Sequence, residues 1–236
     1  MRIIYLLIFL CCLSCNNERV LLLPEIENAK TTEVLDVSPG YIFYDETQPD
    51  STLLNRKNLI ITTNWLVNVD KRLTLKQAIP HIKFLQDKKR NAEMHKNENA
   101  KNYFTCNDTS IKNLGFLEFT DVYYEMVNSH KDSINLHALQ LKPMDDAVIS
   151  ELPIPATYLV IDNGNKADFE NLIKPILQYQ KAIYTAMPDK NIITSGFSLN
   201  IYFDGHLSFQ DYISMKSTLE KLNTEKLKIT SNEFIY

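Results

Sequence analysis

The sequence predicts an α+β fold, a two-layer sandwich assembled from units in which a strand runs through a turn into a capped helix. Three observations support this prediction. Apolar and polar side chains alternate at 65–70, which is the period of a strand. A capping sequence follows at 74–77, and apolar residues then recur at helical spacing. The same order of strand, turn and capped helix returns at 199–219, which indicates an internal repeat.

The first unit covers about 58–88. Its expected strand has an apolar side formed by Trp65, Val67 and Val69. Thr74 and Gln77 match a capping box, in which the two side chains satisfy free N–H groups at the start of a helix. The helical face is formed by Leu75, Ala78, Ile79, Ile82 and Leu85. Pro80 lies beyond the first turn, so we expect it to bend the helix or shorten its start.

The second unit covers about 197–221. Its strand alternates through Leu199, Ile201 and Phe203. Ser208 is the expected N-cap, with Asp211 at the third helical position. The helical face is formed by Phe209, Tyr212, Ile213, Met215 and Leu219. Aligning Asp204 with Asp70 also aligns Leu207 with Leu73 and Ile213 with Ile79.

A looser third copy begins with a strand at 158–162 and continues into a helix for which Asp168 is the expected N-cap. Chance similarity is the alternative to duplication, because any strand that enters a capped helix needs a turn residue and a cap. Each unit has an aspartate at the end of its strand: Asp70, Asp162 and Asp204. Paired carboxylates can perform acid–base chemistry, but the position favours turns in which Asp bonds its own backbone.

The N-terminus reads MRIIYLLIFLCCLSC, with Arg2 followed by an apolar run at 3–13. That run is shorter than the roughly twenty residues that span a bilayer, and it has the proportions of a secretory signal. Ser14-Cys15 resembles the cleavage site of bacterial lipoproteins, in which a small residue precedes a cysteine that is acylated with fatty acids such as palmitate. Leu13 and Cys12 depart from that pattern. The alternatives are a plain cleaved signal or a buried N-terminal strand.

The resemblance implies a signal peptide at 1–14 and lipidation of Cys15. We expect a lipid anchor and tether at 15–57, in which 24–55 becomes extended structure packed on the domain. An α+β domain should follow at 58–236, with two halves at 58–150 and 151–236. We interpret the basic stretch 83–101 as a solvated helix end. The alternative is a patch that binds anionic lipid headgroups.

Composition limits the classes of function. The formal net charge of −4 argues against a nucleic-acid partner, and the 5 glycines argue against Gly-rich phosphate loops. Cys106 would be the one thiol left after signal removal and lipidation, so we expect a small buried hydrophobe and no internal disulfide. The five histidines fit no metal template. We therefore expect no catalytic, metal or cofactor-binding residues and no cofactor.

The stretch from Ile201 to Tyr236 has an acidic turn after Tyr202-Phe203-Asp204, aromatic residues entering the helix, and a closing strand at 227–230. It is similar to the periplasmic half of ExbD/TolR-type biopolymer-transport subunits, and 62–88 looks like the earlier unit of that domain. The resemblance implies a small two-layer fold and a cell-wall or partner-binding role. Those subunits have a membrane helix with a proton-coupling Asp, which this sequence lacks, so motor activity does not carry over.

These features predict a non-enzymatic accessory or binding lipoprotein, linked to an ExbD/TolR-like transport assembly through an envelope protein partner. It should be anchored to the inner or outer membrane of a Gram-negative bacterium and face the periplasm or the cell surface. The alternative is a surface lipoprotein that binds a small ligand or glycan. An envelope hydrolase is the third hypothesis.

Overall fold

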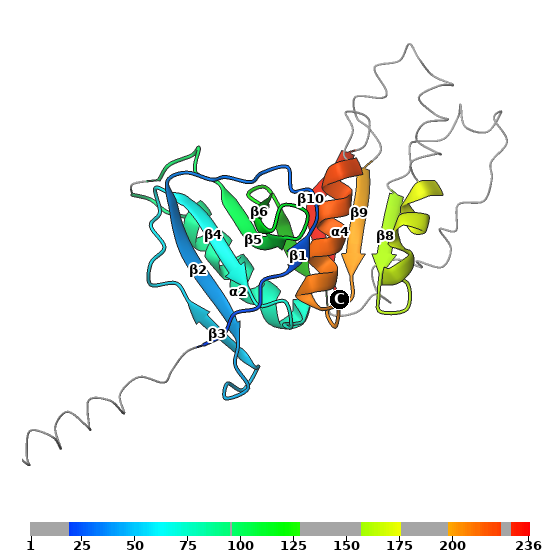
Figure 1. Ribbon diagram of the computed structural model, residues 1–236, viewed down its shortest axis with the longest axis horizontal. Coiled ribbons are helices and arrows are strands. Elements are labelled where there is room, and N and C mark those ends of the chain that lie inside the picture. The colour runs from blue at the N-terminus through cyan, green and yellow to red at the C-terminus, as the bar shows by residue number, and fades with distance from the viewer. Residues whose placement is uncertain (1–18, 95, 128–156, 176–197, 223–227) are drawn as a thin grey trace, which may run out of the picture.

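The computed structural model describes residues 19–94, 96–127, 157–175, 198–222 and 228–236 of the chain. It contains two β-sheets with helices packed beside them (Figure 1), and the α+β class is confirmed. The first sheet has the order β1-β5-β4-β2-β3, and β6 also pairs with β5. Its strands are β1 (Glu25–Ile26), β2 (Val37–Tyr44), β3 (Thr52–Asn55), β4 (Asn64–Val69), β5 (Asn102–Asp108) and β6 (Asn113–Glu118).

The second sheet has the order β7-β10-β9-β8, and all its pairings are parallel. Its strands are β7 (Tyr123–Met126), β8 (Thr157–Ile161), β9 (Ser198–Phe203) and β10 (Lys228–Ile235). A 3-10 turn, η2 (Lys166–Asp168), follows β8 and leads into a helical stretch at 169–175. Helix α4 (Phe209–Leu222) follows β9. Strand β10 is longer than the closing strand predicted at 227–230.

Helix α2 (Leu75–Arg90) starts where the capping box predicts and connects the parallel strands β4 and β5. Pro80 lies inside this helix without shortening its start. Its buried face includes every residue predicted for it: Leu75, Ala78, Ile79, Ile82 and Leu85.

The two predicted units have equivalent surroundings. Each strand, β4 or β9, has a parallel neighbour, β2 or β8, and leads into its helix. Asp70 N–H donates to Ile42 O at 2.9 Å, and Asp204 N–H donates to Ile161 O at 2.8 Å. The series β2, β4, α2, β5 therefore corresponds to β8, β9, α4, β10, as expected of an internal repeat.

One hydrophobic core joins the two units. Phe104 of β5 stacks on Phe119 with ring centroids 3.8 Å apart. The same ring meets Phe209 of α4 edge-on at 5.3 Å. Cys106 lies in this core with no exposed surface, as predicted. The first sheet and the second helix therefore share one apolar interior.

The expected segment boundaries fall as follows. The stretch 24–55, expected to pack on the domain, supplies β1, β2 and β3 to the first sheet. The boundary at 57/58 lies between β3 and β4 of one sheet. Strand β7, from the expected first half, pairs with β10 in the second sheet. The signal peptide, Cys15 and the boundary at 150/151 lie outside the described residues.

Candidate functional site

The turns of the two units lie against each other, with Thr74 opposite Ser208 in an antiparallel bridge. Four backbone hydrogen bonds join the turns: Leu75 N–H to Leu207 O (2.9 Å), Phe209 N–H to Leu73 O (2.7 Å), Lys76 N–H to Gly205 O (2.8 Å) and Gln210 N–H to Lys71 O (3.2 Å). Exchanging the two units maps this set of bonds onto itself. A local two-fold relation therefore places the starts of both helices at one junction.

Both caps at this junction are reciprocal. Thr74 Oγ1 accepts from Gln77 N–H at 3.3 Å, and Gln77 Oε1 accepts from Thr74 N–H at 2.9 Å. Ser208 Oγ accepts from Asp211 N–H at 3.1 Å, and Asp211 Oδ2 accepts from Ser208 N–H at 3.3 Å. Burial opposes ionisation of Asp211, but hydrogen bonds from Lys166 and Ser208 outweigh it and lower the pKa of this carboxyl. Both helix starts are therefore satisfied internally.

The three aspartates at strand ends each accept a backbone N–H two residues ahead. The pairs are Asp70 with Arg72 (3.0 Å), Asp162 with Gly164 (2.7 Å) and Asp204 with His206 (2.8 Å). The turn role predicted for them is confirmed. Each of these carboxylates is therefore engaged by its own turn.

Asp70 has no exposed surface and is the most heavily bonded of the three. The Arg72 guanidinium donates to it twice, at 2.9 and 2.7 Å, and Leu22 N–H donates at 3.2 Å. Burial raises the pKa of Asp70, but these hydrogen bonds outweigh it and lower the pKa below its usual value. The carboxylate thus fixes both its own turn and the incoming N-terminal chain.

A chain of buried polar groups lies between α4, β10 and β7. Tyr212 OH donates to Glu233 Oε2 at 2.7 Å, and Tyr124 OH lies 2.9 Å from Tyr212 OH. Lys216 forms an ion pair with Glu233, which is 1% exposed. Because the Tyr212 O–H donates its hydrogen bond to the carboxylate, Tyr124 is the donor in the tyrosine pair. Burial, and then the charge of Glu233, raise the pKa of both tyrosines. Both tyrosines therefore stay protonated at neutral pH, and their hydrogen bonds hold Glu233 beside Lys216.

A cavity of about 280 Å³ lies beside Lys216, between the 119–122 turn, α4 and the start of β10. Its lining includes Phe119, Thr120, Lys216, Glu220, Thr230 and Ser231. Burial raises the pKa of Glu220. An ammonium, a carboxyl and hydroxyls over an apolar floor can hold a small polar molecule through several hydrogen bonds.

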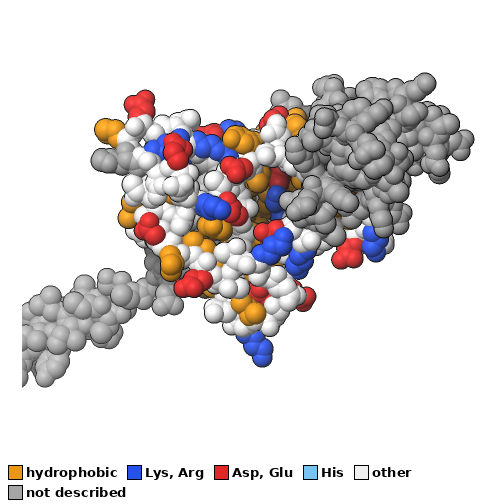
Figure 2. All heavy atoms as spheres, turned by 90° about the horizontal axis from the view of Figure 1, so that it is seen from above, with side chains coloured by type: hydrophobic (Ala, Val, Ile, Leu, Met, Phe, Trp, Pro, Cys, Tyr) orange, Lys and Arg blue, Asp and Glu red, His pale blue; other side chains and the backbone are white. Residues whose placement is uncertain are grey.

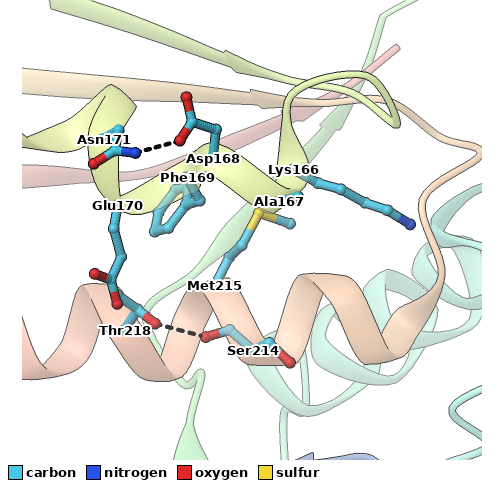
Figure 3. Close-up of a pocket in the computed structure, with 9 residues that line it drawn as sticks. All are labelled: Lys166, Ala167, Asp168, Phe169, Glu170, Asn171, Ser214, Met215 and Thr218. Carbon is cyan, nitrogen blue, oxygen red and sulfur yellow. Dashed lines mark hydrogen bonds between the residues drawn. The ribbon is translucent and has the colours of Figure 1, made fainter.

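A second hollow, of about 330 Å³, lies between 166–171 and α4 (Figure 3). Phe169 and Met215 point toward each other and close its base, while Lys166 extends away and pairs with Asp211 at 2.8 Å. A third hollow, also about 330 Å³, lies across α4 against β1 and shares Ser214 and Thr218 with the second. Both are open grooves along one helix, and neither has a charged group buried at its base.

Lys89 lies in a cage of oxygen atoms at the end of α2. Its Nζ donates to Thr63 O, Lys101 O and Asn102 Oδ1 at 3.0, 3.1 and 3.0 Å, and it lies 4.9 Å from the centre of the Trp65 ring. The residue is 5% exposed, and burial lowers its pKa to about 8. The prediction of a solvated helix end is therefore wrong for Lys89, because its long stem reaches back into the core.

The N-terminal chain forms a strap at 19–31 that is bonded to both units. Lys71 N–H donates to Leu22 O at 2.8 Å, and Asn107 N–H donates to Pro24 O at 2.8 Å. Glu25 and Gln210 exchange two bonds, at 2.8 and 2.9 Å. The strap starts four residues after Cys15, so the predicted lipidation position directly precedes a segment fixed to the domain.

No family model, curated protein or solved structure matches this chain. Within the described ranges, no helix is both long and apolar enough to cross a membrane. Among the same residues, no group of three His, Cys, Asp or Glu side chains is placed to hold a metal ion.

Sequence reasoning missed the buried chain from Tyr124 to Lys216. One signal was available, because Glu233 shares a strand face with buried Ile235 by the period of two. A carboxylate on an inward face needs a partner, and only the fold identifies Lys216 and Tyr212 as the partners.

Proposed function

We propose that the protein is a lipid-anchored envelope protein of a Gram-negative bacterium, attached through Cys15, whose α+β domain has a non-enzymatic binding role. The observation that supports the proposal is that the strap at 19–31 is hydrogen-bonded to the domain. A cysteine with the sequence context of a lipoprotein signal lies seven residues before Leu22, whose N–H bonds the buried Asp70 carboxylate. Acyl chains on Cys15 would therefore hold the domain itself at a membrane.

Substitution of Cys15 tests this proposal. Cys15→Ala should leave an unprocessed precursor and no mature membrane-bound form, because acylation of the thiol precedes cleavage in the resembling signals. Cys12→Ala is the matched control, since it removes a neighbouring thiol of the same apolar run, and it should remain membrane-bound. If Cys15→Ala is processed and still partitions into detergent like the parent, the lipid anchor is refuted.

For the partner, we propose a subunit of an ExbD/TolR-like transport assembly. The two units of strand, acidic turn, capped helix and strand support this, because they have the arrangement that the sequence resemblance implies. Crosslinking in intact envelopes, affinity purification and mass spectrometry should recover such subunits above the level in a Cys15→Ala strain. Recovery at equal levels from both strains would count against an anchored partner complex.

A small ligand or glycan is the second candidate, favoured by the cavity beside Lys216. Titration with a panel of mono- and disaccharides, read by thermal shift, should then identify a ligand. Its effect should be lost in Ser231→Ala and kept in Ser214→Ala, since Ser231 lines the cavity and Ser214 does not. A shift of equal size in both variants would place binding elsewhere.

A further inference from the structure

We propose that one particular end of the domain faces the lipid bilayer. This end, the anchor-side edge, consists of the turns at 45–51, 71–76 and 204–208 together with the C-terminal residue Tyr236. The proposal rests on the proposed lipidation of Cys15. It names a lipid surface as the partner of this edge and leaves the opposite end of the domain for other partners.

The topology brings these turns together. Strands β2, β4, β8 and β9 all end on the same side of the molecule, and α2 and α4 both begin there (Figure 1). The four hydrogen bonds around Thr74 and Ser208 join two of the turns. Gly205 N–H donates to Tyr236 O at 2.8 Å, so the end of the chain lies at this edge too.

The N-terminal chain leaves the domain at the same edge. Arg19 pairs with Asp45 of the 45–51 turn at 3.7 Å, and Leu22 is bonded to Asp70 at the end of β4. The seven peptide units between Cys15 and Leu22 can span at most about 25 Å when fully extended. Val20, at 67% exposure, lies on this short segment. A lipid on Cys15 can therefore reach a bilayer easily only when this edge is turned toward it.

The charges of the edge indicate that the short link to Cys15, and not attraction to lipid headgroups, sets the orientation of the domain. Three of its basic side chains are engaged by nearby carboxylates, in the pairs Arg19–Asp45, Lys71–Glu25 and Arg72–Asp70. The exposed Lys76 is balanced in sign by the exposed Glu46 of the 45–51 turn. Internally paired charges leave a weak net field for lipid headgroups. The orientation should therefore be the same on zwitterionic and anionic membranes.

The opposite end of the domain lies about 24 Å away, the length of the 16-residue helix α2. It carries the basic last turn of α2 and four exposed apolar side chains: Leu35, Val37, Ile60 and Met94. Seen from above, the molecule shows hydrophobic side chains lying among charged ones (Figure 2). In the proposed orientation the basic turn points away from the bilayer, which argues against the headgroup patch considered for 83–101.

Two labels of matched chemistry test the orientation. Glu46→Cys lies in the 45–51 turn and Glu93→Cys lies beyond the end of α2, and both positions are exposed. Burial of Cys106 raises the pKa of its thiol, so a thiol-reactive fluorophore should label only the introduced cysteine of the mature lipoprotein. Each labelled protein, purified from membranes with its lipid, is reconstituted into phosphatidylcholine vesicles that contain a headgroup spin-labelled lipid quencher.

We expect the fluorophore at position 46 to be quenched several-fold more than the one at 93. Equal quenching, or stronger quenching at 93, would overturn the orientation while leaving the lipid anchor intact. A flexible Gly/Ser insertion of twenty residues after Asn17 should remove the difference, because such a linker spans about 25 Å on average. A difference that survives the insertion would overturn the tether argument. Failure of the parent protein to join vesicles would instead refute the lipid anchor itself.

Discussion

Thr74 and Ser208 are equivalent residues that contact each other. Each closes an aspartate turn, caps a helix with a reciprocal partner three residues ahead, and faces the other across an antiparallel bridge. The two units of the fold are therefore held together at the same positions where each begins its helix.

Removing either cap should destabilise the protein. Thr74→Ala and Ser208→Ala each leave helix N–H groups without their acceptor, at a cost of about 1 kcal/mol. For a chain of this size that corresponds to a loss of roughly 2–4 °C in melting temperature. Thr218→Ala, which removes a hydroxyl from the interior of α4, is the control and should melt like the parent. Unchanged melting of both cap variants would show that the caps do not hold the helix starts.

Much of each unit could be predicted from sequence because its signals are local. The alternation around Trp65 and the capping residues at Thr74 and Ser208 specify a strand, a helix start and a buried face within twenty residues. The strap, the parallel pairing of β7 with β10 and the contact between the two turns depend on residues far apart in sequence. No local pattern specifies such contacts, since they follow only from packing both units on one core.

The buried chain at Glu233 should be sensitive to loss of its inner hydroxyl. Tyr212→Phe removes the donor to Glu233 and the acceptor for Tyr124, which leaves buried polar atoms unsatisfied at a cost of about 1–3 kcal/mol. Tyr124→Phe removes only the outer hydroxyl, so urea unfolding should show a smaller loss. A larger loss for Tyr124→Phe would contradict the assigned direction of these hydrogen bonds.

Because Lys89 is buried, the free energy of unfolding should rise with pH. Because burial lowers its folded pKa to about 8, below the unfolded value near 10.5, the unfolded chain binds more protons between these values. The free energy of unfolding should therefore increase from pH 8 toward pH 9.5, before the tyrosines titrate. Lys89→Met, which keeps the length of the stem, should flatten this slope. An equal slope in parent and variant would mean that Lys89 titrates normally in the folded protein.

Gly115 should be required where the strap crosses β6. A Cβ at this position would lie 2.6 Å from Ala29 Cβ, closer than two carbons can approach. Gly115→Ala should therefore displace the strap and lower stability by about 1–3 kcal/mol. At Gly40 a Cβ meets only the tips of the Leu59 side chain, at 3.1 Å, so Gly40→Ala should cost less. Faster proteolysis within the strap of the Gly115→Ala variant would report the displacement directly.

We propose above that Cys15 anchors this domain to a membrane. The most direct test is mass spectrometry of the N-terminal peptide of the mature protein, extracted from membranes of cells that express the full chain. We expect Cys15 to be the first residue and to carry a diacylglyceryl group on its sulfur. A mature chain that begins elsewhere, or an unmodified Cys15 thiol in the membrane fraction, would contradict it.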